Sequence, residues 1–226
     1  MGKSYEEKEV ISRLEKDIAA DKIYLLFKKN YINYSGKPTG NKNEYYFEVL
    51  AKYLLDHKVE ELYKSVKVLP RKQSYKMDDH FVNKNQKKEK WLAKLLLNFK
   101  LDSLGDVIDF EMPIKSSKLD KKVGEVDLLA YNKNEKILSL VELKLRDNPD
   151  TMLHTILQIC TYYHQIDEKK LIQSFKLPST TKIQKAILIF KESPQYEQFK
   201  SKYIKQLVKE LDINVFILDF QVSPLL

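Results

Sequence analysis

Hydrophobic residues in the N-terminal part of the chain recur at every third or fourth position, with charged residues between them. This periodicity is typical of amphipathic helices. It predicts helices over residues 5–28, 43–57 and 85–99. Glycine, proline and mixed polar residues predict loops over 34–43 and 70–83.

The third predicted helix has its large apolar residues on one side, which we expect to face the core. These residues are Trp91, Leu92, Leu95, Leu96 and Phe99. Glu89 has helical spacing to Leu92 and Leu96, so this acid is also expected along the buried face. A carboxylate in that position is unusual unless it reaches a charged partner.

After Gly105 the periodicity changes to short apolar or alternating runs, which favour strands. Asn132 and Asn134 suit a hairpin turn between two of these strands. The predicted strands span residues 107–114, 125–131, 137–146, 186–190 and 215–220. Two more helices are predicted between strands, over residues 150–166 and 196–211.

This order of elements implies an α/β fold in which helices cover a sheet. We expect an N-terminal helical region over residues 1–83 and a domain containing the sheet over residues 84–226. A hydrophobic content of 43% is enough for an ordinary globular core.

The balance of charge is basic. Lysine and arginine number 40 against 32 aspartate and glutamate residues, which gives a formal net charge of +8 and a pI near 9.2. A positive surplus favours polyanionic partners, nucleic acid above all. Lysine-rich sequences also arise from solvated helix faces, so both interpretations stay open.

Cysteine content and hydropathy bear on location. The single cysteine, Cys160, excludes an intrachain disulfide, which favours a cytoplasmic location. No apolar run approaches the roughly 20 residues that a membrane-spanning helix needs. We therefore expect no membrane partner.

The strand ILSLVELKLR carries a carboxylate and an ammonium among apolar residues. Because strand side chains alternate, Glu142 and Lys144 share one face with Leu138 and Leu140. Burying either charge alone would cost roughly several kcal/mol, so each needs a partner or a metal ion. Asp127, on the preceding apolar strand, raises the same problem, and a hairpin would bring it to Glu142.

Two carboxylates that converge with a lysine suit the hydrolysis of phosphodiester bonds. Their oxygen atoms are ligands that Mg²⁺ or Mn²⁺ prefers, and a bound ion lowers the pKa of water. The alternative is an ordinary salt bridge at a strand end. A single Glu-x-Lys sequence is a weak signal, and Asp127 on the adjoining strand strengthens it.

The helix predicted over 150–166 has a polar stripe beside its packing face. His154, Gln158 and Tyr162 recur every four residues. Gln158 and Tyr162 could contact a phosphate or a base. The alternative is a solvated helix flank with a tyrosine that extends to the surface.

The segment from Glu89 to Tyr162 resembles the PD-(D/E)xK nuclease superfamily, in particular its RecB-like branch. The matching motifs, in order, are GEVDLL, VELK and QICTY. The resemblance implies a restriction-endonuclease-like core, a central mixed sheet flanked by helices, and Mg²⁺-dependent (or Mn²⁺-dependent) cleavage of nucleic acid. It implies Asp127, Glu142 and the Leu143 carbonyl as metal ligands, Lys144 as the catalytic lysine, and Gln158 and Tyr162 as substrate-contacting residues.

The same resemblance implies one more acid on the helix before the first strand. Glu89 is the candidate, with a first-turn role at the helix dipole as the alternative. Glu44 on an earlier helix is the runner-up, and Glu125 could be an accessory ligand. Near these residues, lysines that could hold a phosphate backbone include Lys88, Lys121 and Lys122.

The sequence therefore predicts a metal-dependent nuclease that acts on DNA in preference to RNA. One alternative is a catalytically inactive nucleic-acid-binding module on the same fold. Another is a protein-interaction domain whose carboxylates only pair with lysines. The N-terminal helices could also bind a protein partner or a second copy of the chain.

Overall fold

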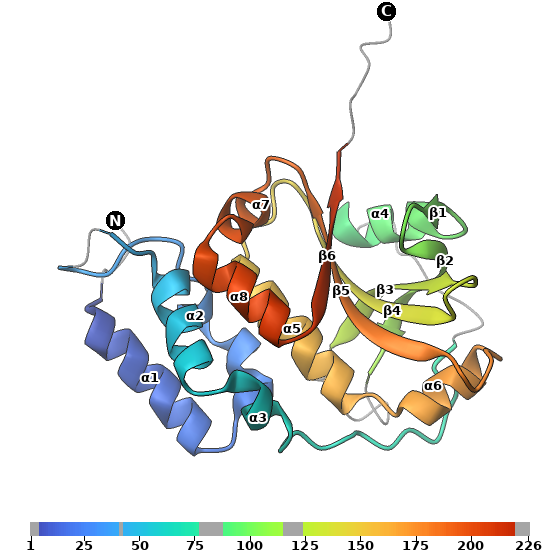
Figure 1. The fold of residues 1–226 in the computed structure, drawn as a ribbon, viewed down its shortest axis with the longest axis horizontal. Helices are drawn as coiled ribbons and strands as arrows, with labels where there is room; N and C mark the ends of the chain where they lie inside the picture. Colours follow the sequence, from blue (N-terminus) through green and yellow to red (C-terminus); the bar gives the residue numbers. More distant parts are fainter. Residues whose placement is uncertain (1–4, 41–42, 77–87, 115–123, 220–226) are drawn as a thin grey trace, which may run out of the picture.

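The computed structural model describes residues 5–40, 43–76, 88–114 and 124–219. It has an α/β architecture in which helices pack on both faces of a six-stranded sheet (Figure 1). The strands are β1 (Lys100–Leu101), β2 (Gly105–Pro113), β3 (Glu125–Asn132), β4 (Ile137–Lys144), β5 (Lys182–Phe190) and β6 (Ile213–Leu218).

The helices of the N-terminal part are α1 (Glu7–Ala19), η1 (Ile23–Lys28), η2 (Asn30–Asn33), α2 (Tyr46–Asp56) and α3 (Val59–Tyr63), where η denotes a 3₁₀ helix. The remaining helices are α4 (Lys88–Leu96), α5 (Met152–Gln165), α6 (Glu168–Ser174), α7 (Pro194–Phe199) and α8 (Lys202–Glu210).

The sheet is mixed, and its strands lie in sequence order. Strands β1 to β4 pair antiparallel, whereas β5 pairs parallel with β4 and β6 pairs parallel with β5. The predicted hairpin between β3 and β4 is confirmed, and Asn132 Oδ1 accepts hydrogen bonds from the backbone N–H groups of Asn134 and Glu135 in its turn. The parallel connections run through the helix pairs α5–α6 and α7–α8.

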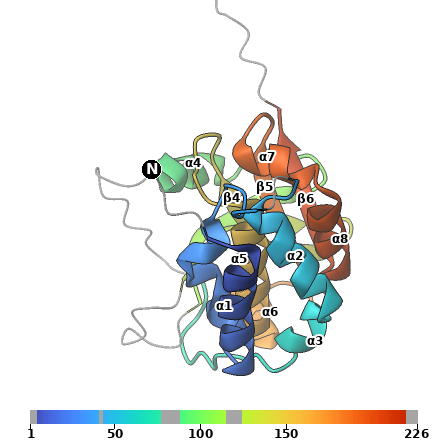
Figure 2. The same cartoon turned by 90° about the vertical axis from the view of Figure 1, so that its left-hand side faces the viewer.

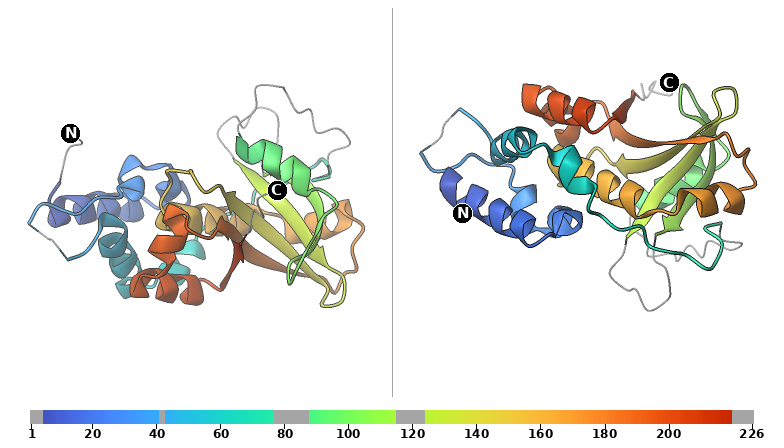
Figure 3. Two further views of the ribbon diagram at one scale, coloured as in Figure 1. Left: turned by 90° about the horizontal axis from the view of Figure 1, so that it is seen from above. Right: turned by 60° about the horizontal axis from the view of Figure 1, so that its bottom comes forward.

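Helices cover the two faces of the sheet unequally. Helix α5 packs on one face together with α8 and the N-terminal helices, and their buried side chains form one continuous cluster with that face. On the opposite face, Ala93 and Leu96 of α4 pack against Val107, Phe110 and Leu128. Figure 3 shows α4 on the side of the sheet away from the N-terminal helices.

Four of the described N-terminal helices contact α5 directly, namely η1, η2, α2 and α3, whereas α1 packs on α2 and η1. Figure 2 shows α1 and α2 in front of α5. Leu26 and Phe27 of η1 and Ile32 of η2 are buried in the cluster that also contains Ile156 of α5. The division into a region 1–83 and a domain 84–226 stays a prediction. Described residues from both sides of that boundary contribute to one hydrophobic cluster.

The single helix predicted over residues 5–28 is wrong. Helix α1 ends at Ala19, and Asp21 takes a left-handed conformation with a φ of 54° before η1 begins. The turn allows Leu26 and Phe27 to pack on α5. Nothing in the local run of alanine, aspartate and lysine breaks a helix strongly, so tertiary packing decides this boundary.

The helix predicted over residues 196–211 is also wrong as one element, because it is interrupted between α7 and α8. Ser201 has an extended backbone there, and its hydroxyl donates a hydrogen bond of 2.7 Å to Glu48 Oε1 of α2. The contact with α2 accompanies the break, and a serine at a helix start is chemically suited to it.

The predicted packing side of α4 needs correction. Trp91 and Leu95 are 59% and 46% exposed, so they lie on the outer side of the helix. The helix ends at Leu96, not at residue 99, and Phe99 beyond it is 61% exposed. Leu96 faces the sheet as predicted, and Ala93, which the prediction did not include, packs beside it. The sheet accepts the small side chain of Ala93 at the closest approach, which the size of Trp91 does not allow. None of the helices in the described ranges is long and apolar enough to cross a membrane.

Candidate active site

The strands β3 and β4 separate at one end of their hairpin. Their backbone pairing runs from Asn132 and Ile137 to Leu128 and Val141 and then stops. Beyond that point the backbone N–H of Leu143 donates a hydrogen bond of 2.8 Å to Asp127 Oδ2. The Asp127 carboxylate thus takes the place of the backbone carbonyl that would accept this hydrogen bond if the strand pairing continued. We call this place, with Asp127, Glu142 and Lys144, the β3–β4 fork.

Glu142 and Lys144 at the fork are both buried. Their exposed fractions are 1% and 3%, and Lys144 Nζ lies 2.8 Å from Glu142 Oε1. The pair satisfies the need for a partner that the sequence predicted. Glu142 Oε2 is buried and has no hydrogen-bond partner among the described residues. An unpartnered buried carboxylate oxygen is costly, which is common at functional sites.

Glu89 of α4 also belongs to this cluster. Its Oε1 accepts a hydrogen bond of 3.2 Å from Asn148 Nδ2, in the turn that follows β4. Its charge contributes to raising the pKa of Asp127, Glu142 and Lys144. The structure therefore places Glu89 near the fork. Glu44 precedes α2, on the far side of α5 from α4.

A small pocket of about 160 Å³ opens beside Asp127. Its lining is rich in carboxylates and comprises Glu89, Lys90, Ala93, Glu111, Glu125 and Asp127. Lys90 Nζ lies 2.6 Å from Glu111 Oε1 and 3.3 Å from Glu125 Oε2. Glu125 thus lines the pocket, as an accessory ligand would. The pocket holds four carboxylates against one ammonium, which favours a cation.

The carboxylates of the fork resist ionisation. Burial raises the pKa of Asp127 to about 6, against the attraction of Lys144 and with a further increase from Glu89. Burial and then the charge of Asp127 raise the pKa of Glu142 well above its usual range. For Lys144, burial lowers the pKa, but the surrounding carboxylates outweigh it and raise the pKa overall. The cluster has a deficit of positive charge.

Gln158 and Tyr162 of α5 lie next to one another and close to the fork. Gln158 Nε2 donates a hydrogen bond of 3.2 Å to Tyr162 Oη. Burial, followed by the charges of Glu142 and Asp127, raises the pKa of Tyr162. The interpretation of this stripe as a solvated flank is wrong, because Tyr162 is only 4% exposed and packs against Phe27 of η1.

Of the three lysines predicted to hold a phosphate backbone, only Lys88 lies within the described residues. Lys88 is exposed at the start of α4, and its Nζ lies 3.0 Å from Asp147 Oδ2. Lys121 and Lys122 lie outside the described residues. Lys88 therefore lies on the surface beside the turn that follows β4, where its ammonium is paired with Asp147.

Oxygen donors at the fork suit a hard divalent cation such as Mg²⁺ or Mn²⁺. The described residues contain no group of three side chains already arranged as metal ligands. One oxygen of each fork carboxylate is engaged, Asp127 Oδ2 by Leu143 and Glu142 Oε1 by Lys144. The N–H of Leu143 points to the β3 side, and in a strand the carbonyl of the same residue points the same way. The unpartnered Glu142 Oε2 and the carboxylate-rich pocket thus fit the predicted donor set.

Sequence reasoning missed four polar residues that the structure brings to the cluster. They are Asn33, Glu111, Asn148 and Asp150. Glu111 lies opposite Asp127 in the β2–β3 register, with a positive φ of 50°. The sequence signal that could have found Glu111 is a carboxylate within the strand predicted over 107–114. Asn33 and Asp150 carry no such signal, because only the folded chain brings them together.

Comparison with protein-family models, with curated proteins and with solved structures finds no match for this chain.

Proposed function

We propose that this chain is a metal-dependent nuclease that hydrolyses phosphodiester bonds at the β3–β4 fork. The observation that carries the proposal is the meeting of Asp127, Glu142 and Lys144, with Glu89 close by, where two apolar strands separate. These side chains are ionisable and lie among apolar strand residues, so hydrophobic packing alone does not explain their presence. Their chemistry suits an ion that binds oxygen ligands and a phosphate that approaches it.

The order of elements supports the same proposal. Helix α4 is followed by the antiparallel strands β2, β3 and β4, then by α5 and the parallel strand β5. We propose that this is the restriction-endonuclease-like core of a PD-(D/E)xK nuclease. In it, GEVDLL supplies Asp127, VELK supplies Glu142 and Lys144, and QICTY supplies Gln158 and Tyr162.

Each residue of the fork has a role in the proposed reaction. Asp127, Glu142 and the Leu143 carbonyl hold Mg²⁺ or Mn²⁺, with Glu89 as a further acid. The ion, when bound, lowers the pKa of water and neutralises charge that develops on the phosphate. Lys144 holds its ammonium beside Glu142, where it orients the attacking water or stabilises the same developing charge. Tyr162 is buried, so we assign it to support of the fork and Gln158 to the substrate side.

Nucleic acid is the proposed substrate, and DNA is favoured over RNA. The net charge of +8 and the exposed Lys88 support an anionic partner. Binding that depends on lysine–phosphate contacts weakens steeply as salt increases, because neutralised phosphates release counterions. Filter binding of a labelled duplex over a range of salt concentrations measures that slope.

Cleavage of plasmid DNA, linear duplex, single-stranded DNA and RNA tests the proposal. We expect cleavage in Mg²⁺ or Mn²⁺, none in EDTA, and a loss of at least roughly 100-fold in Lys144→Met. Lys133→Met is the matched control, because Lys133 is an exposed lysine in the turn at the other end of the same hairpin. Full activity of Lys144→Met would exclude this site.

The same experiment separates the rival classes. A nucleic-acid-binding module without chemistry would bind DNA in EDTA and cleave no substrate in any metal. A protein-interaction domain, in which Lys144 only neutralises Glu142, would show neither cleavage nor salt-dependent binding of DNA. The carboxylate-rich pocket beside Asp127 supports the nuclease over this last alternative, because a structural pair of Glu142 and Lys144 needs no further acids around it.

A further inference from the structure

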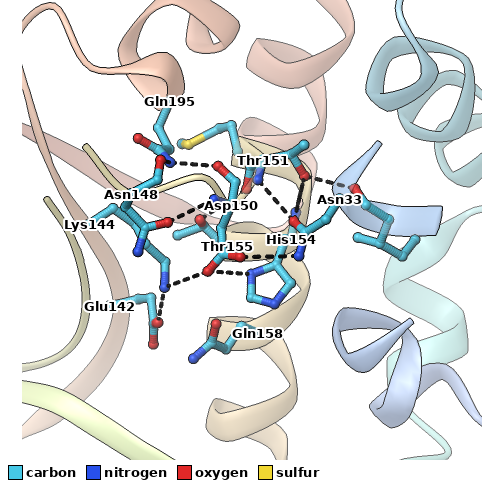
Figure 4. A network of polar contacts seen from close by, with 12 residues as sticks. Asn33, Glu142, Lys144, Asn148, Asp150, Thr151, His154, Thr155, Gln158 and Gln195 are labelled. Atoms are coloured by element: carbon cyan, nitrogen blue, oxygen red, sulfur yellow. Dashed lines mark hydrogen bonds and ion pairs between the residues drawn. The ribbon is translucent and has the colours of Figure 1, made fainter. Parts of the chain in front are cut away.

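Lys144 lies between two carboxylates that come from different elements. Its Nζ is 2.8 Å from Glu142 Oε1 on β4 and 3.5 Å from Asp150 Oδ2. Asp150 belongs to the turn between β4 and α5, which bends back toward the end of the strand (Figure 4). The ammonium is 4% exposed at its side chain, so these carboxylates and not water surround it.

The turn that carries Asp150 is held by several polar side chains. The backbone N–H of Asp150 donates a hydrogen bond of 2.8 Å to Asn148 Oδ1. Gln195 Nε2 of α7 donates to the carbonyl oxygens of Asn148 and Asp150, at 3.0 Å and 2.5 Å. Gln195 is fully buried, so the turn has little freedom to move.

The carboxylate of Asp150 is oriented by a residue far away in the sequence. Asn33, the last residue of η2, donates a hydrogen bond of 3.1 Å from Nδ2 to Asp150 Oδ1. Its Oδ1 accepts one of 3.0 Å from the backbone N–H of Thr151. Thr151 in turn donates from Oγ1 to the carbonyl oxygen of Ile32 at 2.8 Å. The side-chain amide of Asn33 thus donates through Nδ2 and accepts through Oδ1, and these two hydrogen bonds fix the orientation of the amide plane.

We propose that Asp150 is a positioning residue for Lys144 and that Asn33 of the N-terminal helices holds Asp150 in place. The inference rests on the proposed nuclease function, because it assumes that the Lys144 ammonium acts on the substrate. Glu142 is also assigned to the metal ion, whereas Asp150 is assigned no metal ligand role, and its Oδ2 faces the Lys144 ammonium. Lysine has a flexible four-carbon stem, and a second fixed carboxylate removes that freedom.

A consequence is that η1 and η2 form part of the active site. Phe27 of η1 packs edge-on against both His154 and Tyr162. His154 Nδ1 lies 3.6 Å from Asp150 Oδ2, the same carboxylate oxygen that faces Lys144 Nζ. The N-terminal helices thus cover the polar stripe of α5 and complete the surroundings of Lys144 through Asn33 (Figure 4).

Single-turnover cleavage and lysine labelling test the proposal together. Asp150→Asn and Asn33→Ala are each expected to lower the cleavage rate constant by roughly 10- to 100-fold, as supporting partners of active-site groups do. The affinities for Mn²⁺ and for DNA should stay within about twofold of wild type, because neither residue is assigned to them. Asn30→Ala, at an exposed asparagine of the same 3₁₀ helix, is the control and should match wild type.

Reductive methylation followed by mass spectrometry reports on Lys144 without metal or substrate. Both variants should methylate Lys144 at least about fivefold faster, relative to the exposed Lys133, while their unfolding temperatures remain close to wild type. The double variant should lose no more activity than Asp150→Asn alone, because Asn33 acts through Asp150. Additive losses would instead show two independent structural effects and would overturn the proposal.

The outcomes separate this inference from the function on which it rests. A wild-type enzyme that cleaves, together with an Asp150→Asn variant that cleaves equally fast, would refute the positioning role and leave the nuclease standing. Loss of activity in Asp150→Asn with an equal loss of Mn²⁺ affinity would also refute it, because Asp150 would then serve the metal site. Full activity of Lys144→Met would overturn both.

Discussion

At the scale of single residues, the β3–β4 fork and its surroundings contain more acidic than basic side chains. Asp127, Glu142 and Glu89 all influence the one buried ammonium of Lys144, and burial raises the pKa of Asp127 and Glu142. Like charges that share a buried site weaken the folded state. A cluster of this kind is retained where activity requires it, at the expense of stability.

Two isosteric changes at the fork should therefore alter stability in opposite directions. Without metal, Glu142→Gln should raise the Tm, because it removes a charge and leaves Asp127 and Asp150 to neutralise Lys144. Lys144→Met should lower the free energy of unfolding by roughly 3 kcal/mol, because it leaves buried carboxylates unpaired. Thermal and urea unfolding in EDTA measure both. A Tm that falls equally in the two variants would mean that Glu142 and Lys144 are a simple structural pair.

The pH dependence of stability should show the raised pKa of Asp127. A carboxyl whose pKa rises from 3.8 to about 6 on folding stabilises the protein below about pH 4, and that contribution is lost as the pH rises through about 6. Asp127→Asn should remove this loss, so its stability relative to wild type should increase between about pH 4 and about pH 7.

His154 makes the opposite contribution in the same range of pH. Burial lowers its pKa to about 4, so the stability that it contributes at neutral pH is lost as the pH falls through 6.5. Wild type and Asp127→Asn share this loss, and it cancels in their difference. Urea unfolding of both proteins across the range gives that difference. A difference that does not vary with pH would show that Asp127 has an ordinary pKa.

Residues of the site differed in how far the sequence could predict them. Asp127, Glu142 and Lys144 were predictable because each interrupts an apolar strand, and the hairpin register follows from Asn132 in the turn. Asn33 and Asp150 were not, because their contact depends on how η2 packs against the turn after β4. No local pattern encodes a contact between such distant segments.

At the scale of elements, the sequence predicted the central strands and helix α5, whereas it did not predict where two longer helical segments are interrupted. Strands β2 to β4 and helix α5 begin and end close to the predicted positions, since apolar runs and the Thr151 cap mark them. The breaks at Asp21 and Ser201 depend on contacts with other helices. The outward orientation of Trp91 likewise depends on which side of α4 the sheet accepts.

The entry into β3 should tolerate no side chain at Gly124. A Cβ atom built there would lie 1.8 Å from Tyr162 Oη, and Tyr162 is only 4% exposed, so its ring must shift within the core. Gly124→Ala should lower the free energy of unfolding by about 1–3 kcal/mol and reduce cleavage, because Tyr162 and Gln158 shift. Gly36→Ala is the control, since a Cβ there meets only one atom, at 4.0 Å. Equal stability of the two variants in urea would contradict the packing of Tyr162 on Gly124.

At the scale of the whole molecule, the N-terminal helices and the sheet share a core. The cluster that joins them contains Val10 and Leu14 of α1, Leu26 of η1, and Ile156 and Ile159 of α5. Folding of the two parts should therefore be cooperative, since neither buries its apolar face without the other.

Leu26→Ala should lower the stability of the entire chain and not only of its N-terminal part. Leu26 is fully buried, so we expect a loss of about 2–5 kcal/mol and a single calorimetric transition at lower temperature. Tyr24→Ala, at a residue of the same 3₁₀ helix that is 36% exposed, should shift the transition much less. Two separate transitions would show instead that the N-terminal helices unfold by themselves.

Calorimetric titration of Mn²⁺ is the most direct test of the central claim, that the β3–β4 fork holds a divalent ion. Wild type and Glu142→Gln are compared with Glu135→Gln, which changes an exposed glutamate in the turn of the same hairpin. We predict binding by wild type and by Glu135→Gln, and none by Glu142→Gln. Equal binding by all three proteins, or no binding by wild type, would contradict the account.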